Sequence, residues 1–362
     1  DHVHALEASS NLQHITLQTL FENTVIGDVE QTAYLYRIRI NAYKFFDKFN
    51  REMDSVKAHS TVVIFVQWPG MIFLWEAFAS SKWRTVPILM DRLEPLFIAY
   101  PLAKSSQALI RDSFNAALLQ SDGLLTGSIK AAKALSKTLQ VPCREVLSVF
   151  RETSALKVAD GDHGLAGFRP LRIPRNSSNR IALAGQIYAR DTVELFISSL
   201  ERLNDLSNCA GPKCSLDFYG DWPIENLFNN SFVTTHEPLE YSKLMITLAS
   251  TCSFGLVPYS FDQAFSSSAE FSFPSKLVAY IQAGLIPIYV GPKRSSVFEL
   301  LDIYGLAGLC ITEIDVTLIC QSLETIFLSD HDTIRSKLLA LSHVFRPEYL
   351  QLCINSVFDQ VS

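Results

Sequence analysis

Residues 271–291 read FSFPSKLVAYIQAGLIPIYVG, and they indicate the fold more clearly than any other part of the chain. The proline at position 274 predicts the start of a helix, the glycine at 284 predicts its end, and residues 286–290 have the pattern of a buried strand. Nucleotide-binding α/β domains present such a helix start to phosphate. In the first helical turn, the helix dipole disfavours a cation by about 0.3–1 kcal/mol unless an anion is bound. Lys276 therefore either binds an anion or points into water.

Short apolar runs alternate with longer helical patterns along the rest of the chain, which is typical of parallel strands joined by crossover helices. The fold class is therefore α/β. The predicted strands are 61–66, 86–90, 123–125, 145–149, 181–184, 216–219, 232–235, 254–257, 286–290 and 309–311. The clearest predicted helices are 33–53, 105–120, 128–139, 191–206, 240–250, 275–283 and a final helix that ends at 361.

The length of 362 residues, with 48% hydrophobic residues, favours two domains. Residues 160–178 are rich in glycine, proline, serine and arginine and are predicted to link a domain of residues 1–165 to one of residues 166–345. Residues 346–362 form the final helix. A doubly wound domain usually opens with a hydrophobic strand, whereas the first sixty residues here are mostly helical and polar. That strand lies upstream of residue 1, or this chain has dispensed with it.

Composition excludes several classes of protein. The formal net charge of -6 gives no basic face for nucleic acid, and no apolar run approaches the ~18–20 residues that span a bilayer. The seven cysteines are odd in number and scattered, which favours reduced thiols in a cytoplasmic protein. An aromatic stretch at 68–75, WPGMIFLW, either packs on its own sheet or contacts the inner face of a membrane peripherally.

Several polar or glycine-containing turns follow the predicted strands of the second half. Gly185 ends the first of these strands, Gly220 ends the next, and His236 and Glu237 follow the third. The segment 254–259, FGLVPY, then leads into a serine-rich loop at 265–270. Because the carboxyl ends of parallel strands share one edge of a sheet, these turns are expected to lie at one ligand-binding edge.

The order of these motifs, together with PSK at 274–276 and AG at 283–284, resembles the retaining glycosyltransferases of the GT-B fold that build bacterial polysaccharides and glycolipids. The resemblance implies two Rossmann-like domains facing across a cleft, the second holding a UDP- or GDP-linked sugar donor and the first a glycan, lipid-linked or other hydroxyl acceptor. It also implies a hexosyltransferase that needs no metal or cofactor, because helix dipoles and basic side chains neutralise the leaving diphosphate.

The resemblance also implies that the final helix, 346–362, packs back on the first domain, and it implies roles for individual residues. The diphosphate would contact Gly185, Gln186, Arg190, Pro274, Ser275 and Lys276. His236 and Glu237 would flank the nucleobase, and the loop from Ser268 to Glu270 would approach the donor sugar. In the first domain, Asp91 either acts as a base toward the acceptor hydroxyl or caps the segment that follows it.

Two positions depart from the family pattern. Ala279 stands where the family usually has a glutamate that binds the ribose hydroxyls. The lack of this glutamate is expected to weaken donor binding by roughly 10- to 100-fold unless Glu270 compensates. Gln186 stands where arginine or asparagine is common. A catalytically degenerate binding or scaffold protein of the same fold is therefore an alternative. A nucleotide-sugar epimerase is a third hypothesis, but it requires more carboxylates and histidines than the cleft offers.

Overall fold

The computed structural model describes residues 28–53, 60–66, 69–81, 83–90, 93, 97, 102–147, 149, 179–206, 213–220 and 230–361. Its contacts divide the chain into two compact units, Asp1–Pro87 with Leu93–Asp122, and Ile88–Arg92 with Gly123–Ser362. The predicted linker at 160–178 lies outside the described residues, so the domain boundary near residue 165 stays a prediction.

In the described part of the first unit, three helices accompany two strands. They are α2 (Asp28–Glu52), α3 (Pro69–Ala79), α5 (Lys104–Leu119), β1 (Thr61–Val66) and β2 (Arg84–Leu89), whose last two residues belong to the second unit. The side chains of Leu35, Phe73 and Ile110 are buried between the three helices. Arg39 donates two hydrogen bonds, of 3.1 and 2.6 Å, to the carboxylate of Glu76, which joins α2 to α3.

The second unit begins with a short parallel segment. β3 (Leu124–Thr126) and β4 (Cys143–Glu145) flank α6 (Ile129–Leu139), and the four-stranded sheet has the order β1-β2-β3-β4. The last helix, α14 (Pro347–Val361), packs against β4. The hydroxyl of Tyr349 donates to Glu145 at 2.5 Å, and Arg144 donates to Ser356 at 3.4 Å.

The larger sheet of the second unit carries six parallel strands in the order β10-β9-β8-β5-β6-β7. The strands are β5 (Asn179–Ala184), β6 (Cys214–Tyr219), β7 (Val233–His236), β8 (Phe254–Pro258), β9 (Ile286–Val290) and β10 (Cys310–Ile311). Counted from β5, this is the Rossmann strand order. The second and third strands are added on one side of the first strand, and the fourth to sixth strands on its other side, so the strand order reverses between β5 and β8. In such sheets ligands bind outside the carboxyl ends of the strands at that reversal, here between β5 and β8.

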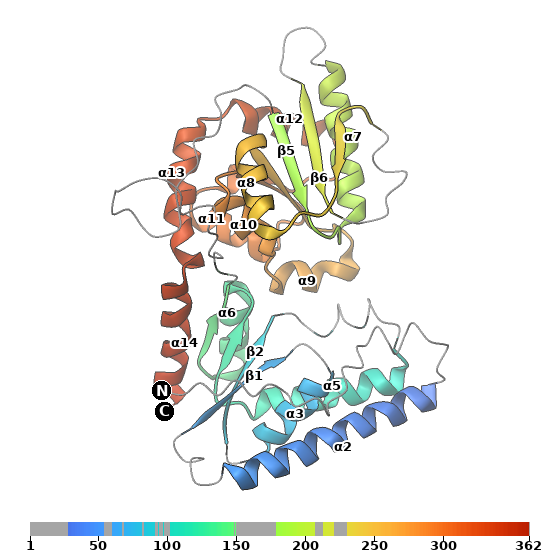
Figure 1. Cartoon of the computed structure of the whole chain (residues 1–362), viewed down its shortest axis with the longest axis vertical. Coiled ribbons are helices and arrows are strands. Elements are labelled where there is room, and N and C mark those ends of the chain that lie inside the picture. Colours follow the sequence, from blue (N-terminus) through green and yellow to red (C-terminus); the bar gives the residue numbers. More distant parts are fainter. Residues whose placement is uncertain are drawn as a thin grey trace. The chain divides into compact units, whose positions relative to one another are not determined.

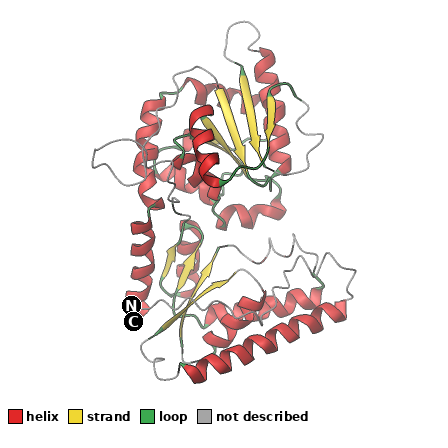
Figure 2. Ribbon diagram, in the orientation of Figure 1, coloured by secondary structure: helices red, strands yellow, loops and turns green. Residues whose placement is uncertain are grey.

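Helices cover both faces of this sheet (Figures 1 and 2). α7 and α12 pack together on one face, and α8 and α10 pack together on the other. The described helices between β5 and α14 are α7 (Arg190–Leu206), α8 (Tyr241–Thr251), α9 (Ser266–Phe271), α10 (Ser275–Gln282), α11 (Ser296–Ile303), α12 (Val316–Leu328) and α13 (His331–Leu341). Three 3-10 turns accompany them, η3 (Gln263–Phe265), η4 (Ala307–Leu309) and η5 (Ser342–Phe345).

Each of the ten described strands overlaps a predicted strand, and the α/β fold class is confirmed. The serine-rich segment at 265–270, expected to be a loop, is instead mostly the helix α9. Serine is a weak helix former, but α9 packs against α6 and α11, and tertiary packing overrides so small a propensity. None of the described helices is long and apolar enough to cross a membrane. The six described cysteines are free thiols.

Gly255 of β8 offers a test of the packing between α10 and the sheet. A Cβ atom added there would lie 2.4 Å from the Cγ and Cδ2 atoms of the buried Tyr280 ring. We expect Gly255→Ala to lower the free energy of unfolding by about 1–3 kcal/mol, because the ring has no free volume to move into. The control is Gly308→Ala, where the added Cβ meets no atom within 4 Å. Urea denaturation measures both variants, and equal losses would contradict the packing argument.

Candidate functional site

The candidate site lies at the carboxyl end of β5, next to the strand-order reversal. Gly185 follows β5 with a φ of +75°, a backbone conformation that favours glycine. Its N–H donates to the carbonyl of Tyr219 at 2.8 Å, so the turn bends toward β6. A Cβ atom on Gly185 would also lie 3.3 Å from the Nζ atom of Lys276. The backbone conformation of the turn therefore favours a glycine, and a side chain here would displace the end of Lys276.

Lys276 reaches this turn from the first turn of α10. Its Nζ atom donates to the carbonyls of Ala184 at 2.5 Å and Gln186 at 2.7 Å, on either side of Gly185. Burial lowers the pKa of Lys276 to about 8. Lys276 therefore points at the Gly185 turn, which excludes the interpretation that it simply points into water.

The contacts of Lys276 leave part of its bonding capacity open. A lysine ammonium has three hydrogens, and the two carbonyls accept two of them. Carbonyl groups solvate a cation but do not neutralise it, and a charge held away from water is costly unless it is paired. The third hydrogen and the uncompensated charge suit an anion such as a phosphate group.

α10 begins at Ser275, as predicted, and this residue is exposed. Pro274 is the N-cap residue of the helix. One turn further on, the buried hydroxyl of Tyr280 accepts a hydrogen bond of 2.9 Å from the N–H of Ala184. Lys276 and Tyr280 thus hold the carbonyl and the N–H of the same residue at the end of β5.

The loop after β8 is joined to the start of α7 by two hydrogen bonds that sequence reasoning missed. The hydroxyl of Ser260 donates to Asp191 at 2.9 Å, and the hydroxyl of Thr192 donates to the carbonyl of Tyr259 at 2.7 Å. These bonds link the first turn of α7 to the loop after β8, and the two segments lie on either side of the strand-order reversal. Their only signal in the sequence is a pair of short polar residues at the start of a predicted helix, which also fits simple capping.

Gln186 and Arg190 were both predicted to contact the diphosphate. The carbonyl of Gln186 accepts from Lys276, and its side-chain oxygen accepts from the hydroxyl of Tyr188. Arg190 is exposed, and its Nε atom donates to Glu194 at 2.8 Å along the same helix. The structure therefore brings Gly185, Gln186 and Lys276 together, whereas Arg190 has an ion-pair partner one turn along α7.

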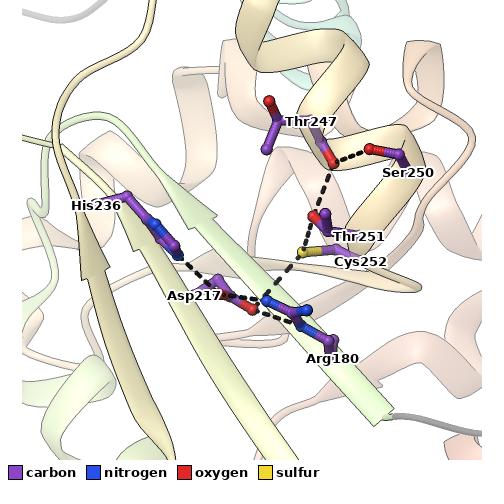
Figure 3. Close-up of polar contacts among 7 residues, drawn as sticks. All are labelled: Arg180, Asp217, His236, Thr247, Ser250, Thr251 and Cys252. Atoms are coloured by element: carbon purple, nitrogen blue, oxygen red, sulfur yellow. Dashed lines mark hydrogen bonds and ion pairs between the residues drawn. The ribbon is translucent and has the colours of Figure 1, made fainter.

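His236 lies at the carboxyl end of β7, with the exposed Glu237 directly after it. The imidazole stacks on the ring of Tyr219, with centroids 4.4 Å apart and planes 9° apart. Its Nε2 atom lies 2.8 Å from the Oδ1 atom of Asp217, a carboxylate that is only 1% exposed (Figure 3). Sequence reasoning missed Asp217, although a charged residue within a buried strand almost always has a partner.

Two positions were assigned in the sequence to the donor's sugars: Glu270 to the transferred sugar and Ala279 to the place of the usual ribose-binding glutamate. The Glu270 carboxylate lies 3.1 Å from the Nε atom of Arg294 and 3.9 Å from the ammonium of Lys130. Ala279, within α10, packs against the core, and its side chain offers no polar atom. Glu270 is therefore already paired with two cations. Asp91, the predicted acceptor-side base, lies outside the described residues.

Within the described ranges, no group of three or more histidine, cysteine, aspartate or glutamate side chains is arranged to hold a metal ion. The strongest local charge at the turn after β5 is the ammonium of Lys276, which can stabilise an anion without a metal.

Comparison with known proteins places this fold. No protein-family model matches the chain, and no curated protein matches it by sequence. Among solved structures, it is similar to a UDP-forming alpha,alpha-trehalose-phosphate synthase from Burkholderia xenovorans, with a TM-score of 0.59 and 11% identity over 97% of this chain and 83% of that one. A structure of such a synthase from the same organism in complex with glucose-6-phosphate gives a TM-score of 0.57 and 13% identity over 88% of this chain and 76% of that one.

A third similar structure is a trehalose-6-phosphate structure from E. coli bound with UDP-2-fluoro glucose, with a TM-score of 0.59 and 10% identity over 94% of this chain and 80% of that one. At such identities the similarity establishes the fold alone. The fold is therefore the GT-B architecture of two Rossmann-like parallel-sheet parts, as the motif order predicts.

The lowered pKa of Lys276 gives stability a specific pH dependence. The unfolded chain keeps this proton up to the ordinary pKa of 10.5, whereas the folded protein loses it near pH 8. Between these values the unfolded state binds more protons, so the free energy of unfolding rises with pH. The wild type should therefore gain stability relative to Lys276→Met from pH 8 to 10, by at most about 1.4 kcal/mol per pH unit.

Denaturant unfolding at several pH values measures this difference. The control is Lys337→Met, because the Nζ atom of Lys337 also donates to a carbonyl, that of Gly305 at 2.9 Å, but from an exposed position. Its difference from wild type should stay flat with pH. A flat difference for Lys276→Met as well would show that the Lys276 ammonium is fully solvated.

Proposed function

We propose that the protein is a glycosyltransferase that moves a hexosyl group from a nucleoside-diphosphate sugar to a hydroxyl acceptor, with retention of configuration and without a metal. The donor is UDP- or GDP-linked and binds at the carboxyl edge of the six-stranded sheet. The observation that carries this proposal is Lys276, an incompletely neutralised ammonium aimed at the Gly185 turn. A diphosphate at that turn would supply the missing negative charge.

The similar structures support the same donor class. The synthases from Burkholderia are UDP-forming, and the E. coli structure holds UDP-2-fluoro glucose. The position of the turn after β5, at the reversal of strand order, is where open α/β sheets bind nucleotides. Fold and site geometry therefore favour the same class of ligand.

In the proposed reaction, the bond between the anomeric carbon and the diphosphate oxygen breaks, and a bond from that carbon to the acceptor oxygen forms. The acceptor hydroxyl gives its proton to the proposed base, Asp91, and negative charge grows on the leaving diphosphate. A cation held at the turn stabilises this charge more in the transition state than in the bound donor, which is the requirement for catalysis.

The acceptor is proposed to be a glycan, a glycolipid or a sugar phosphate, in keeping with polysaccharide or oligosaccharide synthesis. The synthase structure with glucose-6-phosphate is an example of a sugar phosphate bound by this fold. We place the reaction in the cytoplasm, because the six described cysteines are free thiols. Asp91 keeps its proposed role as a base toward the acceptor.

Two observations favour a second candidate, a nucleotide-binding scaffold of the same fold without catalysis. Ala279 provides no hydrogen bond for the ribose, and Glu270 is paired with Arg294 and Lys130. In the scaffold hypothesis the protein binds the nucleotide but does not release UDP or GDP from any sugar donor. A screen of UDP- and GDP-sugars that detects both the free nucleoside diphosphate and the glycosylated product separates the two candidates.

Nucleotide binding itself is tested by thermal unfolding with millimolar UDP or GDP. A ligand at one hundred times its Kd stabilises the folded state by about 2.7 kcal/mol, which raises Tm by a few degrees. We expect this rise for the wild type and for Lys337→Ala, and its loss in Lys276→Ala. The proposal fails if no nucleoside diphosphate raises Tm. An equal rise in wild type and Lys276→Ala would show that the lysine does not contact the ligand.

A further inference from the structure

Arg180, Asp217 and His236 form a charge network around the buried carboxylate of Asp217, on the side of the sheet where α8 lies (Figure 3). The carboxylate of Asp217, in the middle of β6, accepts two hydrogen bonds from Arg180 of β5, at 3.0 Å from Nε and 2.8 Å from Nη2. Its Oδ1 atom also lies 2.8 Å from the Nε2 atom of His236 on β7. One carboxylate thus joins three neighbouring strands.

The charges of this network determine which ring nitrogen of His236 carries a hydrogen. An ionised carboxylate can only accept hydrogen bonds, so the Nε2 atom that faces Asp217 must be the donor. Arg180 already neutralises the carboxylate, and its own pKa is raised mainly by the hydrogen bonds to Asp217. The Arg180–Asp217 ion pair therefore needs no second cation, and a neutral His236 imidazole with hydrogen on Nε2 satisfies the remaining hydrogen bond of the carboxylate. The Nδ1 atom is then an acceptor.

The environment of the imidazole holds it in place while leaving it accessible. The buried ring of Tyr219 stacks on it at 4.4 Å, which fixes the plane of the imidazole. The His236 side chain is 34% exposed, so a ligand can reach it. Among the described residues, the imidazole has no hydrogen-bond partner besides Asp217. A fixed and exposed acceptor is suited to recognising an N–H group.

The position of His236 relative to the Gly185 turn fits a nucleotide. β7 is the second strand from β5, and neighbouring strands lie about 4.7–4.9 Å apart, so the ends of these two strands are separated by roughly 9–10 Å. A ribose and a phosphate group span a comparable distance. A nucleoside diphosphate with its phosphates at Lys276 therefore places its base at the level of His236.

We propose that Asp217 is a positioning residue that holds His236 in the tautomer with hydrogen on Nε2, so that Nδ1 accepts the N3–H of a uracil base. This inference rests on the proposed function, because it assigns the base of the same donor. In a uridine nucleotide N3–H is the only N–H of the base, so one fixed acceptor can read it. His236 contacts the substrate, whereas Asp217 and Arg180 act through His236.

The test compares the binding of three probes by calorimetry: UDP, UDP methylated at N3, and pyrophosphate. The methyl group removes the one N–H of uracil, and pyrophosphate has no base at all. We expect the wild type to bind UDP about tenfold or more tightly than the N3-methylated form. His236→Ala should bind both with similar affinity, and Asp217→Asn should show a reduced preference. Pyrophosphate should bind equally to the wild type and to both variants, because its site is at Lys276.

His343→Ala is the matched control, because His343 is a second histidine beside a tyrosine ring, with its centroid 5.9 Å from that of Tyr304 and the planes 56° apart, outside the proposed site. It should keep the full preference for UDP. The inference is overturned if the wild type binds both uridine ligands equally, if His236→Ala keeps the preference, or if His236→Ala loses pyrophosphate. A wild type that binds neither UDP nor pyrophosphate contradicts the proposed function itself.

Asp217→Asn removes the charge that neutralises Arg180 and is expected to be the least stable variant. If it does not fold, nitrogen NMR of the wild type reports the tautomer directly, with the His236 signals assigned by their loss in His236→Ala. An unprotonated Nδ1 supports the inference. A hydrogen on Nδ1 overturns it.

Discussion

The structure of the candidate site depends on how α10 holds the last residue of β5. The N–H of Ala184 donates to the hydroxyl of Tyr280 at 2.9 Å, and its carbonyl accepts from the Nζ atom of Lys276 at 2.5 Å. These two side chains, four residues apart, lie on one side of the helix. Gly255 lets the ring of Tyr280 lie against β8. The turn after β5 is thereby fixed by a helix that the chain forms some ninety residues later.

A second fixed element, the Arg180, Asp217 and His236 network, lies on the same side of the sheet, because Asp217 and Gly255 are both register partners of Ala182. Its buried carboxylate accepts from Arg180 and lies 2.8 Å from the Nε2 atom of His236, and these contacts favour one arrangement of the three strands that carry the residues. Together the two elements link β5 to α10, β6 and β7. The carboxyl edge of the sheet is therefore held by charged and polar contacts, in addition to the apolar packing of the core.

The sequence predicted the strands because each is a short apolar run, and this periodicity depends only on local composition. It located Gly185 and Lys276 because a glycine turn and a cation at a helix start are both locally unusual. It did not predict the Asp217 network or the Ser260 to Asp191 bond, because these pairs are separated by 19 to 69 positions and form only when strand order is known. α9 was also missed, since its helix depends on packing against α6 and α11.

The absence of a carboxylate at Ala279 has a consequence for how the proposed donor would be recognised. A charge-assisted hydrogen bond contributes about 1.5–3 kcal/mol, and neither Ala279 nor the paired Glu270 supplies one to the ribose. Binding energy must then come from the two ends of the nucleotide. Lys276 at the diphosphate and His236 at the base are the two groups placed to supply it, and both are held by other side chains or carbonyls. Pre-positioned groups lose little conformational entropy on binding, which offsets part of the missing ribose contact.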